Sequence, residues 1–258
     1  MTKFKTSSII FIAILLGLLT GRFFFEIPGI LFVLIAFLYI GIVVIGVFNI
    51  RWNFFLTSYN NGSNLKKAIA ITFDDGPNAQ YTPALLDFLA SQNLRATFFC
   101  VGENILDNNQ LLKRMINEGH IIGNHSYSHS TMFDFKLPSR MIEEISTTND
   151  KIFEMTGRIP RFFRPPFGIT NPFVAKAVKM LKMESIGWSL RSLDTIKDKS
   201  KVISRIMRKV QPGDIILLHD RNEHTLSLVK EIVIWLKNNA YNIVSLDTLL
   251  AIEAYEAH

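Results

Sequence analysis

Short apolar segments alternate with longer helical segments from about residue 67 onward, and this alternation constrains the fold more than any other feature. Segments such as Ala68–Phe73 and Ile215–His219 have the length and the residue types of buried strands. Segments such as Ser139–Met155, which Gly157 soon follows, have the end signals of helices. Repeated β–α units predict a parallel sheet covered by helices, either open or closed into a barrel.

The expected strands and helices follow one another without internal repeats. The strands are Ala68–Phe73, Ala96–Val101, His120–Gly123, Phe162–Arg164, Glu184–Ser189, Ile215–His219 and Ile243–Ser245. The helices are Thr82–Gln92, Asn108–Glu118, Ser139–Met155, Asn171–Leu181, Ser200–Val210 and Thr225–Asn238.

Two apolar segments precede this region. Thr6–Phe25 is apolar except for Arg22, and Ile30–Phe48 is uncharged and close to the ~20 residues that a helix needs to cross a bilayer. We predict a two-helix transmembrane hairpin over 1–50, a linker over 51–66 and a catalytic domain over 67–258. The alternative for the first segment is a signal peptide, but no small-x-small cleavage site follows it, and cleavage would leave the second span unexplained.

The formal charge of +6 and the pI near 9.4 suit an anionic partner. No run of Lys and Arg interleaved with aromatic residues is present, so we expect no nucleic-acid partner and interpret the charge as a solvated basic surface near a membrane. The single cysteine, Cys100, rules out an internal disulfide. The bilayer is an expected partner, and no obligate protein partner is evident.

Titratable residues fall at or just after the ends of the expected strands. Asp74 and Asp75 follow the first strand, His125 and His129 the third, Arg164 ends the fourth, Asp194 follows the fifth and His219 ends the sixth. Because the carboxyl ends of parallel strands meet at one edge or mouth, these side chains are expected to converge.

The adjacent Asp74 and Asp75 have diverging side chains, so the two carboxylates are expected to do different work, although an Asx turn could also end a strand this way. His125 and His129, four positions apart, are expected on one side of a helical turn, where they could ligate one metal ion together with one Asp. Position 126 is Ser, so the Glu base of zinc peptidases is missing, and the adjacent Asp74 is the natural supplier of a base.

The segment Arg164–Gly168 reads RPPFG, a stiff loop that fixes one guanidinium and offers a backbone N–H near Phe167 for an oxyanion. A surface Arg on a rigid turn is the structural alternative. His219 ends a buried strand, where a general acid could reach a leaving amine, while a buried and hydrogen-bonded His is the other interpretation.

Residues from about Lys67 to Asp247 resemble the polysaccharide deacetylases, the NodB-homology domain of carbohydrate esterase family 4. The five motifs occur in order as Thr72–Gly76, His125–His129, Arg164–Gly168, Trp188–Thr195 and Leu217–Asp220. The resemblance implies an α/β fold, a distorted (β/α)7-type barrel, here preceded by the transmembrane hairpin.

The resemblance also implies a role for each motif residue. Asp74 would be the base, Asp75, His125 and His129 the ligands of a divalent ion, expected to be Zn²⁺, and His219 the acid. Arg164 would orient Asp74, Asp194 would tune His219, the Phe167 amide would meet the oxyanion, and Leu217 would line the pocket for the acetyl methyl group.

Two motifs depart from the family pattern. The third motif usually carries Tyr where this chain has Phe167. The fourth usually reads Asp-x-x-Asp-Trp, whereas this chain has Arg191 in place of the first acid and Thr195 in place of the Trp. These changes concern the shape and charge of the substrate site, and not the reaction.

The resemblance implies a metal-dependent N-deacetylase that hydrolyses the acetamide, a non-peptide carbon–nitrogen bond, of an N-acetylated amino sugar in a glycan, with cell-wall peptidoglycan as the expected substrate. A lipid-linked amino sugar at the membrane is the alternative substrate. An inactive sugar-binding domain is the other class, and the intact Asp74 and His219 argue against it.

Two spans place Met1 and the catalytic domain on the same side of the membrane. Lys3, Lys5 and Arg51 favour the cytoplasm by the positive-inside rule, whereas a cell-wall substrate requires the outer face. We expect a multi-pass protein of the cell (inner) membrane whose catalytic domain lies on the extracytoplasmic face.

Overall fold

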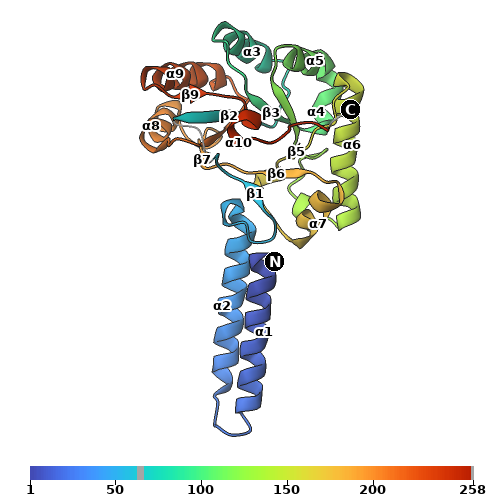
Figure 1. Cartoon of the computed structure of the whole chain (residues 1–258), viewed down its shortest axis with the longest axis vertical. Coiled ribbons are helices and arrows are strands. Elements are labelled where there is room, and N and C mark those ends of the chain that lie inside the picture. The colour runs from blue at the N-terminus through green and yellow to red at the C-terminus, as the bar shows by residue number, and fades with distance from the viewer. Residues whose placement is uncertain (63–66, 257–258) are drawn as a thin grey trace.

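A helical hairpin projects from an α/β domain in the computed structural model of the chain, which describes residues 1–62 and 67–256 (Figure 1). The last four residues of the expected linker and the last two of the expected catalytic domain lie outside the described residues. The N-terminus of α1 and the C-terminus of α2 both lie next to the domain, so Met1 and the domain are at the same end of the hairpin (Figure 1).

The strands and helices have the following bounds. The strands are β1 Ser58–Tyr59, β2 Ala68–Asp74, β3 Thr97–Cys100, β4 Ile121–Asn124, β5 Phe162–Phe163, β6 Glu184–Ile186, β7 Leu190–Arg191, β8 Ile215–His219 and β9 Asn242–Ile243. The helices are α1 Lys3–Gly21, α2 Gly29–Phe48, α3 Thr82–Ser91, α4 Gly102–Ile105, α5 Asn109–Asn117, α6 Pro138–Thr156, α7 Pro172–Met180, α8 Lys199–Lys209, α9 Thr225–Asn238 and α10 Leu246–Leu250. The 3₁₀ turns are η1 Ile50–Trp52, η2 Leu106–Asn108, η3 Phe133–Phe135 and η4 Pro166–Gly168.

The strands form one parallel sheet in the order β1-β6-β5-β4-β3-β2-β8-β7, with β9 paired to β2. The sheet curls into an open barrel, and helices cover its outer face (Figure 1). The prediction of a distorted β/α barrel preceded by two apolar helices is therefore confirmed. The sheet includes one strand, β1, from the segment predicted to be a linker.

The alternation along β2 determines which side chains face the site. Ile69, Ile71 and Phe73 belong to the core between the sheet and α3, α5, α8 and α9, whereas Ala68 and Ala70 belong to the core on the inner face of the sheet. Small residues suit that inner face, where side chains from several strands share a narrow space. Because strand side chains alternate with period two, Thr72 and Asp74 continue the inner face toward its carboxyl end.

The structure differs from the sequence prediction mainly around β6 and at the end of the chain. The single strand expected over Glu184–Ser189 is two strands, β6 and β7, because the chain crosses from one edge of the curled sheet to the other at Gly187–Ser189. The predicted strand Ile243–Ser245 is only the short β9, and α10 follows it to cover the inner core with Leu246 and Leu249.

The two N-terminal helices are long enough and apolar enough to cross a membrane. Most of their side chains are exposed, and they contact each other through a stack of the Phe11 and Tyr39 rings, 4.2 Å between centroids, and a Ser8–Tyr39 hydrogen bond of 2.7 Å. A helix that exposes apolar side chains on every face is stable only in an apolar environment. Membrane-spanning helices and signal sequences share this property.

Candidate active site

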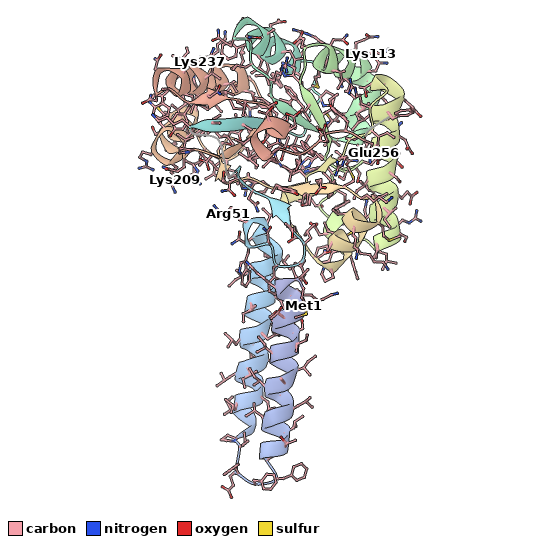
Figure 2. The ribbon with its side chains drawn as sticks, viewed as in Figure 1. Met1, Arg51, Lys113, Lys209, Lys237 and Glu256 are labelled. Carbon is pink, nitrogen blue, oxygen red and sulfur yellow. The ribbon has the colours of Figure 1, made fainter. Side chains whose placement is uncertain are left out.

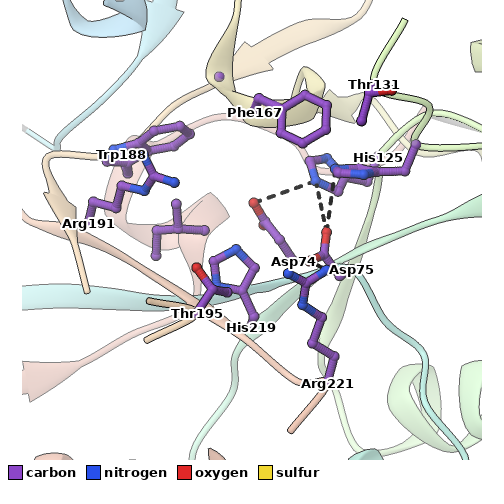
Figure 3. Close-up of a pocket in the computed structure, with 13 residues that line it drawn as sticks. Asp74, Asp75, His125, Thr131, Phe167, Trp188, Arg191, Thr195, His219 and Arg221 are labelled. Atoms are coloured by element: carbon purple, nitrogen blue, oxygen red, sulfur yellow. Dashed lines mark ion pairs between the residues drawn. The ribbon is translucent and has the colours of Figure 1, made fainter. Parts of the chain in front are cut away.

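A pocket of about 380 Å³ opens at the carboxyl ends of β2, β4, β7 and β8 (Figure 3). Thirteen residues line it: Asp74, Asp75, His125, His129, Thr131, Phe167, Gly168, Trp188, Arg191, Thr195, Leu217, His219 and Arg221. The structure thus brings together every predicted metal, base, acid and pocket residue. Arg164 and Asp194 lie directly behind them, in contact with Asp74 and His219.

Arg164 is fully buried and holds one side of Asp74. Its Nη1 donates to Asp74 Oδ1 at 2.7 Å and to Thr72 Oγ1 at 2.8 Å, while Nη2 donates to the Gly187 carbonyl at 2.8 Å and Nε to the Ile186 carbonyl at 3.3 Å. A buried guanidinium with this many partners has one orientation. Asp74 Oδ2 is left facing the pocket, 3.7 Å from His125 Nε2.

Asp75, His125 and His129 form a group that could hold a metal ion. Asp75 Oδ1 lies 3.6 Å from His125 Nε2 and 3.4 Å from His129 Nε2 (Figure 3). Asp75 has left-handed backbone, φ +76°, and both carboxylates lie near His125 Nε2, but only Asp74 is bound to Arg164 and only Asp75 lies close to His129 and Arg221. Two imidazoles and one carboxylate make a donor set that suits Zn²⁺ and leaves positions open.

The histidine nitrogens are in the state that a metal requires. His125 Nδ1 lies 2.7 Å from the Arg164 carbonyl, so it carries the proton and Nε2 presents its lone pair to the group. Burial, followed by the charge of His125, lowers the pKa of His129 to about 4, which keeps that ring neutral at pH 7. The residues present therefore fit a divalent ion.

The histidine pair does not lie on a helix, and that part of the prediction was wrong. The segment after β4 is a loop with left-handed backbone at Ser126, φ +64°, and at His129, φ +45°. Glu144 of α6 shapes it by accepting hydrogen bonds from the Tyr127 and Ser128 amides at 3.2 and 2.9 Å. Spacing of four residues identified the pair, but the contacts that bring the rings together come from a distant helix.

His219 ends β8 and is bound to Asp194. Its Nδ1 lies 2.8 Å from Asp194 Oδ1, and its backbone N–H donates to Asp194 Oδ2 at 2.8 Å. Burial opposes protonation of the ring, but the hydrogen bond and charge of Asp194 outweigh it and raise the pKa of His219. Burial also disfavours the charged form of Asp194 and by itself would raise the pKa of that carboxyl group. The hydrogen bonds and charge of His219, together with the hydrogen bond from Ser192, outweigh burial and hold the pKa of Asp194 below its ordinary value. The raised pKa favours the doubly protonated ring, whose Nε2–H is the group that a general acid needs.

The loop over Arg164–Gly168 forms one wall of the pocket. The Gly168 N–H donates to the Pro165 carbonyl at 3.0 Å, so it is already engaged. The Phe167 N–H is therefore the candidate hydrogen-bond donor to an oxyanion. The Phe167 ring is half exposed and lies 4.7 Å from the His129 ring, centroid to centroid. The buried Leu217 also lines the pocket and adds an apolar side chain to it.

Three lining residues had no predicted role. Trp188 packs so closely on Gly168 that a Cβ at position 168 would collide with the indole ring. Trp188 thus adds an aromatic side chain to a pocket in which Thr195 stands where the family usually has Trp. Arg221 Nη1 lies 2.9 Å from Asp75 Oδ2, and Thr131 lies near the histidine loop (Figure 3). Arg221 had a sequence signal, since it stands two residues beyond His219 at a strand end.

Comparison with known proteins identifies the class. A family model described as polysaccharide deacetylase matches residues 61–186. The peptidoglycan-N-acetylmuramic acid deacetylase PdaA of Bacillus subtilis is 32% identical over 194 residues, which cover 73% of this chain and 73% of that protein. The chain therefore belongs to the polysaccharide deacetylase family, and the predicted class of hydrolase is confirmed. It spans 39% of the length of peptidoglycan-N-acetylglucosamine deacetylases of Listeria monocytogenes that it matches at 33% identity.

Solved structures share the fold. The Bc1960 peptidoglycan N-acetylglucosamine deacetylase superposes with a TM-score of 0.71 at 29% identity, over 76% of this chain and 94% of that chain. A carbohydrate esterase family 4 pseudoenzyme from Bacillus anthracis, BA3943, superposes with a TM-score of 0.68 at 27% identity, over 74% of this chain and 67% of that one. Both resemblances are to the α/β domain, since the coverage leaves about a quarter of this chain unmatched.

The buried position of Arg164 leads to a stability prediction. Arg164→Met keeps apolar volume but leaves Asp74 buried without its partner, so the variant should lose about 3–5 kcal/mol of unfolding free energy at neutral pH. Urea unfolding of the detergent-solubilised protein, followed by tryptophan fluorescence, measures this. The control is Arg161→Met, which breaks a one-third-exposed pair with Glu184 and should cost less than about 1 kcal/mol. Equal losses would show that the buried pair has no special role.

Proposed function

We propose that this chain is a metal-dependent N-deacetylase that hydrolyses the acetamide of an N-acetylated amino sugar in peptidoglycan. One observation carries the proposal: a base, a metal-binding group and an oriented acid converge on one pocket, in the order of the family motifs. Asp74 is the base, Asp75, His125 and His129 hold the divalent ion, with Zn²⁺ as the expected metal, and His219 is the acid.

The chain's own residues provide the proton transfers. When bound, a divalent ion would polarise the acetyl carbonyl and lower the pKa of water at the site. Asp74, fixed by Arg164 through Oδ1, offers Oδ2 to accept the proton of the attacking water. Leu217 is placed to contact the acetyl methyl group, and the Phe167 N–H is placed to donate to the oxygen that becomes negative.

His219 completes the reaction on the other side of the pocket. Asp194 holds the ring through Nδ1, so the protonated Nε2 can donate to the sugar nitrogen as the carbon–nitrogen bond breaks. Acetate and a free amino sugar are the products, and the proton taken by Asp74 balances the one given by His219. An inactive sugar-binding domain would need neither group, so the presence of both Asp74 and His219 in the pocket supports an active deacetylase.

Arg191 extends the proposal to the substrate. It lies on the pocket wall beside Trp188, away from Asp75 and Arg221, and forms no ion pair with any residue in 1–62 and 67–256 (Figure 3). The alternative that Arg191 only pairs with a neighbouring carboxylate thus has no support. A cation in this position suits a glycan with a negative group near the amino sugar, such as the lactyl carboxylate of muramic acid or a lipid phosphate.

The hairpin completes the proposal. We propose that α1 and α2 span the cell membrane, that the catalytic domain comprises 67–258, and that it lies on the extracytoplasmic face, where peptidoglycan is found. The exposed apolar side chains of both helices support a membrane location, and the names of the relatives support a cell-wall substrate.

Substitutions of the two adjacent aspartates should have different effects on metal binding and on the rate. Asp75→Asn should bind the divalent ion more weakly, because it removes a charged ligand. Asp74→Asn should keep the ion and lose about 10²–10⁴-fold in kcat, because it removes only the base. Metal content after gel filtration and acetate release from N-acetylated muropeptides measure the two effects.

Chelation is the matched control for both variants. The unmodified protein should lose activity in chelator and regain it when Zn²⁺ is added back. Full activity after exhaustive chelation would contradict metal dependence, and equal metal content in the two variants would contradict the division of roles.

The His219–Asp194 pair predicts a pH effect. Asp194 raises the pKa of His219, and a general acid must be protonated, so kcat/KM should fall as pH rises through that pKa. Asp194→Asn removes the charge and leaves burial to lower the pKa, so the basic limb of the profile should move to lower pH. A pH profile of acetate release measures the shift. An unmoved basic limb would mean that another group is the acid.

Arg191 should discriminate between substrates. Arg191→Ala should lower kcat/KM for an N-acetylmuramic acid glycan by about ten- to a hundredfold more than for neutral chito-oligosaccharides, because a hydrogen bond to a charged group contributes ~1.5–3 kcal/mol. Lys209→Ala, on α8 and outside the pocket lining, is the control and should change neither value. Equal losses on both substrates would make Arg191 structural.

A further inference from the structure

The segment Ile50–Asn60, here called the juxtamembrane segment, is folded against the α/β domain. Its strand β1 pairs in parallel with β6, and Ser58 Oγ lies 2.8 Å from Ser185 Oγ. Asn53 adopts left-handed backbone, φ +53°, and its side chain accepts the Ser58 N–H at 2.9 Å. Phe54 is only 2% exposed and packs on Gly46 of α2. The hairpin therefore does not hang from a flexible tether.

The same segment supports the residue that holds the base. The Tyr59 carbonyl accepts the Gly187 N–H at 2.9 Å, and the Gly187 carbonyl accepts Arg164 Nη2 at 2.8 Å. Arg164 in turn holds Asp74. A series of hydrogen bonds thus connects β1 of the juxtamembrane segment, through Gly187 and Arg164, to the base.

The hairpin and the juxtamembrane segment each contact the chain next to one pocket wall. The buried Thr170, two residues after Gly168, donates its N–H to the Val47 carbonyl of α2 at 3.0 Å. Arg51 Nη1 donates to the Ser189 carbonyl at 3.3 Å, next to Trp188. Arg51 lies where the hairpin meets the domain, and β1, β6 and β7 lie at that end of the domain (Figures 1 and 2).

These contacts fix the pocket close to the membrane surface, if α2 spans the bilayer as proposed above. α2 is apolar to its last residue, Phe48, whose side chain is 69% exposed, so the hydrocarbon boundary lies near the contacts of Val47 and Arg51. A flexible tether of n residues would spread the domain over roughly 5–6 Å × √n, whereas a hydrogen-bonded junction holds it at one height.

We infer that the pocket takes its amino sugar from a glycan that is itself tethered to the membrane, such as a strand still joined to a lipid through phosphate. This inference rests on the proposed deacetylase function and specifies its substrate class. A rigid, short junction raises the effective concentration of a tethered glycan and keeps distant sugars out of reach. Arg191 lines the pocket, pairs with no carboxylate among the residues that the structure describes, and suits the negative charge of a lipid phosphate or of a sugar carboxylate.

The test compares one oligosaccharide in three forms, with the full chain in phospholipid nanodiscs. The N-acetylated oligosaccharide is supplied soluble, coupled to a lipid through phosphate, or coupled through an uncharged ether. The unmodified protein should deacetylate both tethered forms at least about tenfold faster than the soluble form at equal total concentration. A preference for the phosphate form over the ether form would assign the Arg191 contact to the lipid. Equal rates on the two tethered forms would show that Arg191 does not recognise the lipid phosphate.

Two insertions locate the cause of the preference. About twelve Gly and Ser residues inserted between Phe48 and Asn49 should reduce the preference, because the domain is then no longer held at one height above the membrane surface. The same insert after Glu26, in the turn at the far end of the hairpin, leaves the junction intact and should keep the preference. The inference would be overturned if the variant with the insert between Phe48 and Asn49 showed the same preference for tethered forms as the unmodified protein. It would also be overturned if the unmodified protein showed no such preference.

A further measurement needs no variant. With the unmodified protein, lengthening the linker between lipid and sugar beyond its optimum should lower the rate, since effective concentration falls with linker length. A rate that does not depend on linker length would overturn the inference even if the junction variant failed to fold. Absence of acetate release from every form, including the soluble one, would instead reject the deacetylase function.

Discussion

The buried ion pair between Arg164 and Asp74 organises the site. A guanidinium removed from water is tolerated only when it is paired and hydrogen-bonded, and Arg164 meets this requirement with one carboxylate, one hydroxyl and two backbone carbonyls. Its own carbonyl receives His125 Nδ1. One side chain and its backbone therefore position the proposed base, set the tautomer of one proposed metal ligand and connect β2, β5 and β6.

Much of this arrangement was predictable from local sequence. The alternation of apolar strands with amphipathic helices predicts the barrel, and the helix bounds agree within a residue or two because caps and periodicity are local signals. The convergence of Asp74, His125, Arg164 and His219 was predictable for a geometrical reason: strands in a parallel sheet end at the same mouth, so residues that follow strands become neighbours.

The parts that could not be predicted depend on contacts between distant segments or on unusual backbone. The histidine loop has left-handed residues and is shaped by Glu144, so spacing alone suggested a helical turn that is absent. The Trp188 wall depends on Gly168 lying against it. The strand β1 has only two residues and no periodicity, and it exists because β6 offers an unpaired edge.

The site needs two histidine environments of opposite kind within one pocket. His129 is buried beside a second imidazole, and these two effects outweigh the opposing charge of Asp75 and lower its pKa to about 4, whereas His219 is also buried but is hydrogen-bonded to Asp194 and has a raised pKa. Burial alone would lower both values, and at His219 the direct hydrogen bond and the charge of Asp194 reverse that effect. A neutral ring can donate a lone pair to a metal, and a protonated ring can donate a proton to a leaving nitrogen. Separating the two pKa values in this way allows ligand and acid to coexist at one pH.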